Sequence, residues 1–68
     1  MHLIQRMLAD KSALPESQQI VLSAERRQFL KRRWRSEAAD GTEFGFDLEA
    51  RLADGCVIHH ENGNDYIV

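Results

Sequence analysis

Two adjacent histidines, His59 and His60, are the residues with the clearest potential for metal chemistry. Imidazole nitrogen is a common ligand for zinc, nickel and copper. Adjacent side chains of an extended strand point to opposite faces, so both rings cannot bind one ion without leaving extended geometry. A site normally needs three or more ligands, and His2 or Cys56 would join one ring only if the fold brought them together. His59 and His60 are therefore candidates for a weak site only, and we expect the chain to bind nickel weakly or not at all.

The single cysteine, Cys56, is expected in the core, on one strand face with Ile58 and His60. Free cysteine is more often a small buried hydrophobe than a nucleophile. One cysteine allows no internal disulfide and no CxxC pair, which favours a reducing, cytoplasmic location. No nucleophile with a spaced base and no pair of carboxylates in a plausible pocket can be identified. We therefore assign no catalytic residue and expect a protein that is not an enzyme.

Charge is distributed unevenly along the chain. Residues 25–35, ERRQFLKRRWR, carry a local charge of +5, whereas residues 36–68 carry −7 and the first 24 residues sum to zero. A basic block beside an acidic remainder binds a polyanion or pairs internally across a sheet. Composition alone does not choose between the two.

In an extended strand, the cations of this block fall on two faces. Lys31, Arg33 and Arg35 line one face, and Arg32 shares the other with Trp34. Cations beside a tryptophan are typical of a groove for single-stranded nucleic acid. The alternatives are a solvated face whose arginines pair with acids of the next strand, and a patch that recruits an acidic protein. Arg32, Arg33, Trp34 and Arg35 are thus the candidate partner-binding residues, and Trp34 becomes a core residue if it is buried.

Turn signals divide the chain into about six short strands that must position these side chains. Asp40-Gly41 predicts a two-residue hairpin turn, which requires a strand on each side of it. Further turns are expected at 54–55 and 62–65, a loop at 9–17, and one helical turn near residues 23–28. Strands are predicted at 3–8, 20–22, 32–39, 43–48, 56–60 and 66–68.

The strand after the Asp40-Gly41 turn alternates most clearly. Its apolar side chains, Phe44, Phe46 and Leu48, point one way. Glu43 and Asp47 point the other way, where they would face the arginines of the preceding strand.

Before the turn, Leu30, Trp34 and Ala38 are spaced by four, which places them on one face of either a helix or a strand. The hairpin favours the strand.

With 68 residues, the chain is long enough for one small domain, residues 1–68, and too short for most enzyme architectures. The pattern predicts an all-β fold, either two small three-stranded sheets or a compact barrel. No apolar stretch approaches the roughly 20 residues that span a bilayer, so we expect a soluble protein without membrane contact.

The ordered set of motifs resembles the N-terminal domain of the urease accessory protein E family, the nickel chaperones of urease assembly. The resemblance covers most of residues 3–68. It rests on a Leu-Ser turn with Glu-Arg, an arginine-alternating strand, the Asp-Gly hairpin, a Gly-apolar-Asp-Leu strand and a second Leu-x-Asp-Gly. These are Leu22, Ser23, Glu25 and Arg26; Arg33 and Arg35; Asp40 and Gly41; Gly45, Phe46, Asp47 and Leu48; and Leu52, Asp54 and Gly55.

This resemblance implies a small β domain that is joined, in the full-length family, to a ferredoxin-like domain that dimerises and holds nickel. That second domain is absent from this sequence, so no nickel ligand of the family carries over. The chain is expected to be either a piece of a longer protein or a short stand-alone relative. It would bind no cofactor by itself, with nickel implied only for the full-length family.

The resemblance implies a non-catalytic role in nickel delivery, metallocentre assembly and urease maturation. Its expected partners are the urease apoprotein or other urease accessory proteins, and a homodimer is also compatible. The alternative is a stand-alone small β-barrel that binds nucleic acid through the arginine-rich strand.

Overall fold

The computed structural model describes residues 1–24 and 26–68, except for the side chains of Arg26 and Phe29. Glu25, which belongs to the expected Leu-Ser turn with Glu-Arg, lies outside the described residues. Within them the chain forms six strands and two short 3-10 helices, so the all-β prediction is confirmed. The strands are β1 (His2–Ile4), β2 (Gln19–Val21), β3 (Arg33–Glu37), β4 (Glu43–Asp47), β5 (Val57–Glu61) and β6 (Asn64–Ile67), and the helices are η1 (Glu16–Gln18) and η2 (Arg26–Leu30).

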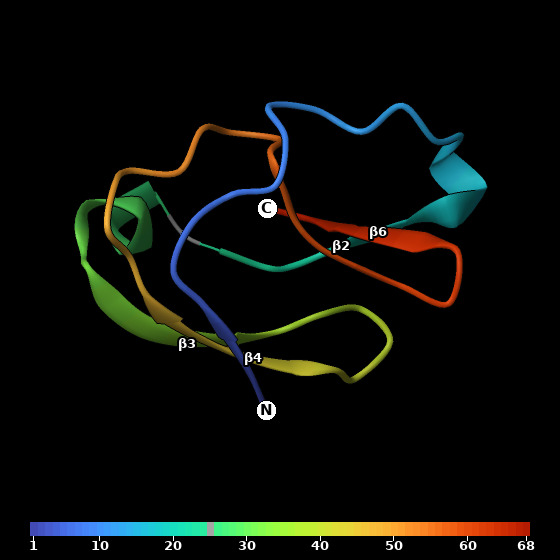
Figure 1. The fold of residues 1–68 in the computed structure, drawn as a ribbon. Helices are drawn as coiled ribbons and strands as arrows, with labels where there is room; N and C mark the ends of the chain where they lie inside the picture. The colour runs from blue at the N-terminus through green and yellow to red at the C-terminus, as the bar shows by residue number, and fades with distance from the viewer. Residues whose placement is uncertain (25) are drawn as a thin grey trace.

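The strands form two three-stranded sheets rather than a closed barrel (Figure 1). We call β1-β4-β3 the first sheet and β2-β6-β5 the second sheet. Each consists of an antiparallel hairpin, β3–β4 or β5–β6, to which a strand from the N-terminal part of the chain adds in parallel. The central strand of each sheet is therefore the one that comes last in sequence.

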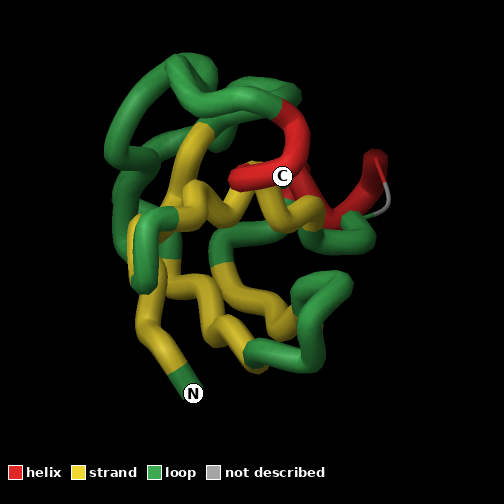
Figure 2. The backbone as a smooth tube through the Cα atoms, turned by 90° about the vertical axis from the view of Figure 1, so that its right-hand side faces the viewer, coloured by secondary structure: helices red, strands yellow, loops and turns green. Residues whose placement is uncertain are grey.

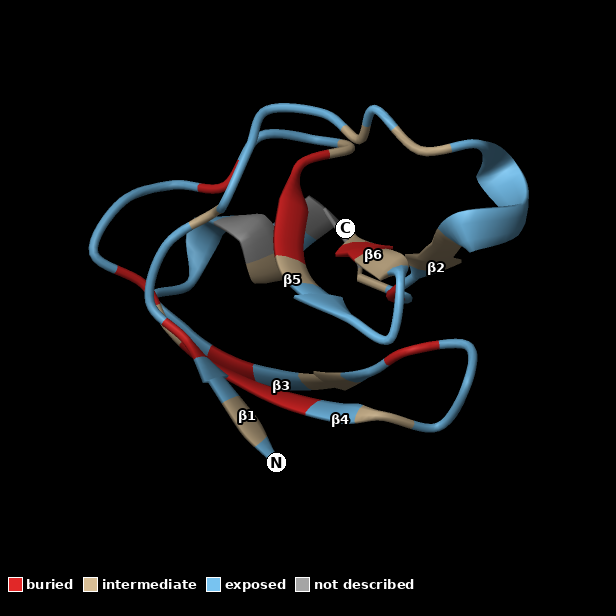
Figure 3. Cartoon of the chain, turned by 45° about the vertical axis from the view of Figure 1, so that its right-hand side comes forward, coloured by how far each residue is buried: buried red, intermediate tan, exposed pale blue. Residues whose placement is uncertain are grey.

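The core lies between the two sheets. Phe44, Phe46 and Leu48 are all buried, as the alternation of β4 predicts. Figure 3 shows buried stretches on β3, β4, β5 and β6, which belong to both sheets, whereas most loop residues are exposed. Hydrophobic burial against the opposite sheet thus sets the face of each strand.

The turn between β3 and β4 differs from the expected two-residue turn. Gly41 has the left-handed φ of 90° that favours glycine, but Asp40 does not share it. The Gly41 N–H donates to the Ala38 carbonyl at 2.9 Å, and the Ala38 N–H donates to the Thr42 carbonyl at 2.8 Å. The loop therefore contains three residues, a type I turn closed by a left-handed glycine.

The two-residue turn occurs instead between β5 and β6. Asn62 and Gly63 both have positive φ, 54° and 79°, which is the backbone of a type I′ turn. The turn expected at 62–65 is thus two residues long, and Asn64 and Asp65 belong to β6.

Two predicted elements are displaced. The first strand is His2–Ile4 rather than 3–8, and the helical turn expected near 23–28 is the 3-10 helix η2. Leu30 ends η2 and is 69% exposed, so it does not share the buried face of Trp34 and Ala38. Neither helix in the described part of the chain is long enough to span a membrane.

Tyr66 ties the second sheet to the first. Its hydroxyl donates to Asp40 Oδ2 at 2.6 Å, and Asp40 Oδ1 accepts the Thr42 N–H at 3.0 Å. The Tyr66 bond, followed by the Thr42 bonds, lowers the pKa of the Asp40 carboxyl. The same hydrogen bond raises the pKa of Tyr66.

Figure 2, turned by 90°, shows the two layers side-on, with the N-terminus on the side of the first sheet.

Candidate functional site

Trp34, one of the four candidate partner-binding residues, is a core residue. Its side chain is on the inner face of β3, only 9% exposed, and it stacks on Phe46 with ring centroids 3.8 Å apart and planes 7° apart. Trp34 and Phe46 are paired across the β3–β4 ladder, which aligns the rings. The indole face is therefore covered by protein and offers no platform for a nucleic-acid base.

Arg32 and Arg33 converge on one acid of the neighbouring strand. Their Nε atoms lie 3.5 and 3.4 Å from the same carboxylate oxygen, Asp47 Oδ1. The expected cross-strand pairing with Asp47 is thus present, but Arg32 precedes β3 and points to this acid rather than sharing the face of Trp34. Both arginine side chains are largely exposed, so the pairs contribute little to stability.

Glu43 does not pair with an arginine as expected. In the β3–β4 register it lies opposite Glu37, whereas Arg35 lies opposite Gly45. Among the described residues Arg35 forms no salt bridge. The outer side of β3 and β4 is therefore cationic toward Arg33 and anionic toward Glu37 and Glu43.

An apolar strip crosses the same outer side. Leu3 of β1 lies opposite Gly45 of β4, and the Leu3 residue is 64% exposed. Because Gly45 has no side chain, Met1 approaches closely, and its Sδ and Cε atoms would lie 3.2 Å from a Cβ at that position. One shallow pocket of this side is lined by Met1, Leu3, Arg33, Arg35 and Gly45, together with the largely buried Trp34 and Phe46. We call the first five residues the outer face of the first sheet.

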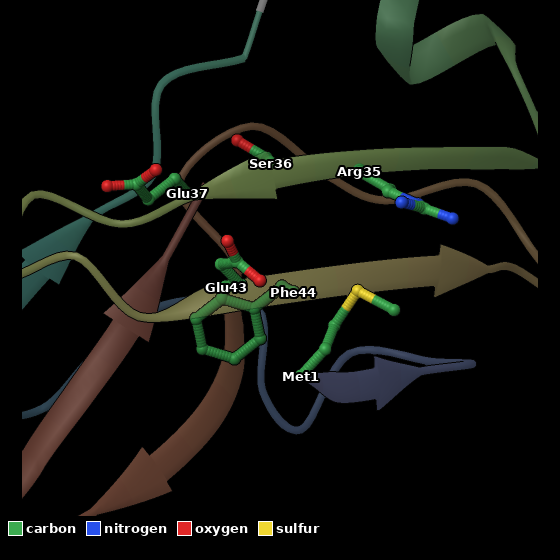
Figure 4. A pocket seen from close by; sticks show the side chains of 6 residues that line it. All are labelled: Met1, Arg35, Ser36, Glu37, Glu43 and Phe44. Carbon is green, nitrogen blue, oxygen red and sulfur yellow. The ribbon is translucent and has the colours of Figure 1, made fainter.

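Figure 4 shows an adjoining pocket of this surface from close by. Met1 reaches up toward β4 from below, and Arg35 extends along β3 on the same side as the Met1 sulfur. Glu37 and Glu43 lie toward the other end of the two strands. The surface thus combines an apolar centre with a cationic end and an anionic end.

The two candidate histidines of β5 point in different directions. His60 Nδ1 lies 2.6 Å from Asp65 Oδ1, on the solvent side of the second sheet, and the Ser12 hydroxyl donates to Asp65 Oδ2 at 2.7 Å. The Ser12 bond, followed by the His60 bond, lowers the pKa of Asp65. Since serine and histidine each bind the acid rather than one another, this trio does not form a nucleophile–base pair.

His59 points inward because β5 contains a β-bulge. Val57 pairs with Ile67 and His59 with Tyr66, which leaves Ile58 as the extra residue. The prediction that Cys56, Ile58 and His60 share one face is consequently wrong for His60, which points to solvent. The bulge places Ile58 and His59 on the inner face in succession.

The inward ring of His59 meets His2 of β1. The ring centroids are 4.4 Å apart, and His59 also packs against Phe44 and Tyr66, with centroids 5.6 Å away in each case. Burial first, and then His2, lower the pKa of His59, whereas Glu61 acts to raise it. One potential ligand atom from each of His2, His59 and Glu61 lies within 4.8 Å of the others.

We call this group the His2–His59–Glu61 cluster. Sequence analysis names His2 as a ligand that could join one of the β5 histidines, but it does not place the two rings together and does not include Glu61. His2 and Glu61 are 59 residues apart, and no local sequence signal marks the bulge at Ile58 that turns His59 inward. His60, the other sequence candidate, lies outside the cluster.

Cys56 is fully buried, as predicted for a core residue. Burial is the first cause that raises the pKa of its thiol, and nearby Asp10 and Asp54 add to the effect. A neutral, enclosed thiol is neither a nucleophile nor a ready metal ligand.

No protein-family model matches this chain, and neither the curated proteins nor the solved structures include a detectable relative. The described residues offer two candidate sites: the outer face of the first sheet and the His2–His59–Glu61 cluster.

Proposed function

We propose that this chain is a non-catalytic docking domain that binds another protein through the outer face of its first sheet. The observation that carries the proposal is the combination of Leu3, an exposed apolar side chain, with Arg35, a cation that forms no salt bridge among the described residues. An apolar contact supplies binding free energy, and a neighbouring charge selects the partner and speeds encounter. The partner that fits presents an acidic side chain beside an apolar one.

The resemblance to the urease accessory protein E family supports a choice of partner. A small β domain of two short sheets is the architecture that this resemblance implies, and the chain has two three-stranded sheets. We propose accordingly that the partner is the urease apoprotein or another urease assembly factor. In that role the domain contributes to nickel insertion by holding the assembly together.

The nucleic-acid alternative receives less support from the structure. It relies on an aromatic side chain that stacks bases beside cations that follow the phosphates. Trp34 is stacked on Phe46 inside the protein, and Arg32 and Arg33 both lie against Asp47. The outer surface therefore combines cations with an apolar strip and acids, which suits a protein partner better than a polyanion.

Binding to the urease apoprotein in complex with its other assembly factors tests the proposal. Arg35→Glu and Leu3→Ser each change one exposed side chain of the outer face and should leave the fold intact. We expect Arg35→Glu to weaken binding roughly tenfold, mainly through slower association at low salt, because repulsion replaces steering. Leu3→Ser should mainly speed dissociation.

Lys11→Glu is the matched control for Arg35→Glu. It makes the same change in net charge on the exposed loop beside Ser12, which is bonded to the second sheet. We expect this variant to bind like the unmodified chain. Unchanged binding by both outer-face variants, or equal weakening by Lys11→Glu, would contradict docking through this surface.

A further inference from the structure

The His2–His59–Glu61 cluster lies where the two sheets approach each other at their edges. In the strand orders β1-β4-β3 and β2-β6-β5, both β1 and β5 are outer strands. His2 comes from β1, whereas His59 and Glu61 come from β5. The alternation of β5 after the bulge places His59 and Glu61 two residues apart on the same face.

We propose that this cluster binds one divalent first-row transition metal ion, of which Zn²⁺ is the representative. Two imidazoles and one carboxylate are ligands that such ions accept, and three protein ligands with an open fourth position is a common arrangement for zinc. This proposal goes beyond the docking function and does not depend on it. It also adds Glu61 to the pairing of His2 with one histidine ring that the sequence allowed.

The distances are compatible with a site that closes on its ion. Ligand atoms about 2.0–2.2 Å from a tetrahedral zinc ion lie roughly 3.3 Å from one another. In the cluster they lie within 4.8 Å of one another. Small rotations of two side chains would shorten these distances to those of a zinc site, because Glu61 is exposed and His2 is only partly buried.

The surroundings distinguish the cluster from an ordinary group of surface side chains. Phe44, which is completely buried, lies against both imidazoles and forms an apolar floor. His59 Nε2 is buried and has no hydrogen-bond partner among the described residues. A buried polar nitrogen without a partner requires an explanation, and an ion or its bound water near this ring would provide one. On the opposite side, the exposed Glu61 leaves the cluster open to solvent, so an ion could enter and exchange.

The competing explanation is aromatic packing alone. The rings of His2 and His59 are tilted by 33° at 4.4 Å, a geometry that also suits two neutral stacked rings. Packing alone gives Glu61 no role, whereas metal binding requires its carboxylate. Glu61 is therefore the residue that separates the two explanations.

Titration of the metal-free chain with Zn²⁺ by calorimetry, beside a weak competing chelator, tests the proposal. We expect one Zn²⁺ per chain. Glu61→Gln and His2→Gln should each weaken binding by at least about tenfold, because even residues that only orient a ligand change metal affinity 10- to 100-fold. Zn²⁺ at about 100 times its dissociation constant should raise the folding equilibrium constant roughly 100-fold in the unmodified chain. Bound Co²⁺ should show the strong visible absorption of a four-coordinate ion.

His60→Gln is the matched control, because it removes the neighbouring imidazole on the other face of β5. We expect it to bind Zn²⁺ within about twofold of the unmodified chain. Glu61→Gln is an exposed, nearly isosteric change, so circular dichroism should confirm that this variant remains folded. Three results would overturn the proposal: a dissociation constant above about 1 mM for Zn²⁺, unchanged Zn²⁺ affinity in Glu61→Gln, or a loss of affinity in His60→Gln as large as that in Glu61→Gln.

Discussion

Removing the Trp34 indole should cost this small domain much of its stability. A domain of 68 residues is stable by about 3–10 kcal/mol at typical values per residue. Trp34 is 9% exposed, and replacing a buried tryptophan by alanine costs about 3–5 kcal/mol in lost transfer free energy and a residual cavity. Trp34→Ala should therefore lose between about a third and all of this free energy of unfolding. Trp34→Phe, which keeps a ring against Phe46, should lose less, about 1–2 kcal/mol.

The stacked geometry gives this prediction a second part. Rings 3.8 Å apart and nearly parallel should couple by about 0.5–1.5 kcal/mol beyond the area they bury. A double-mutant cycle with Trp34→Leu, Phe46→Leu and the double variant isolates that coupling. Urea unfolding followed by circular dichroism measures each free energy of unfolding. In the unmodified chain Trp34 is the only tryptophan, so its emission should shift to the red on unfolding.

Two outcomes would refute the reasoning. One is a cost below about 1 kcal/mol for Trp34→Ala, which is typical of a surface substitution. The other is native emission that acrylamide quenches as efficiently as that of free tryptophan. Either result would restore Trp34 as an exposed residue available for docking.

Three other features give separate predictions. The pKa of Asp40 is lowered from 3.8, so its contribution to stability is present above that pH and is lost as the pH falls through the lower folded value. Tyr66→Phe removes the first cause of this shift, and thermal melts below about pH 4 should then show a shallower loss of stability with acidification; an unchanged slope would contradict the bond. Gly63→Ala should destabilise the β5–β6 turn by about 1–2 kcal/mol because its φ is 79°, whereas Asn62→Gly keeps the left-handed backbone and should change the melting temperature little. Cys56 should react with a thiol reagent slowly in the native protein and rapidly in urea; fast native labelling would show that its side chain is accessible.

Local patterns were sufficient for the parts of the fold that form between neighbours in sequence. Strict alternation in β4 identified its buried face, and the glycine-bearing turns located both hairpins. The length of the β3–β4 loop was wrong because Asp-Gly is compatible with two turn types. Which turn forms depends on contacts outside the dipeptide, because the Asp40 carboxylate accepts hydrogen bonds from the Thr42 N–H and from the distant Tyr66 hydroxyl.

Contacts between distant segments were beyond a reading of the sequence. Nothing near His2 indicates that β1 pairs in parallel with β4, or that its ring meets that of His59. A β-bulge reverses the face of every residue that follows it, so one extra residue at Ile58 moved His59 inward and His60 outward. The arginine-rich strand was easier to predict, because Arg33 and Asp47 are joined by a local hairpin.

The strand order also has a consequence for synthesis on the ribosome. β1 and β2 emerge first, but their parallel partners are β4 and β6, and β6 is the central strand of its sheet. The hairpin β3–β4 can form early and pair with β1. In its own sheet, however, β2 has no neighbouring strand until β6 has left the exit tunnel, and only its last residue, Val21, bonds to Ala39 beside that hairpin. Such non-local pairing slows folding and leaves an unpaired strand in the nascent chain. A nascent chain stalled before β6 should therefore be sensitive to protease throughout its second sheet, and it should become resistant only when those last strand residues emerge.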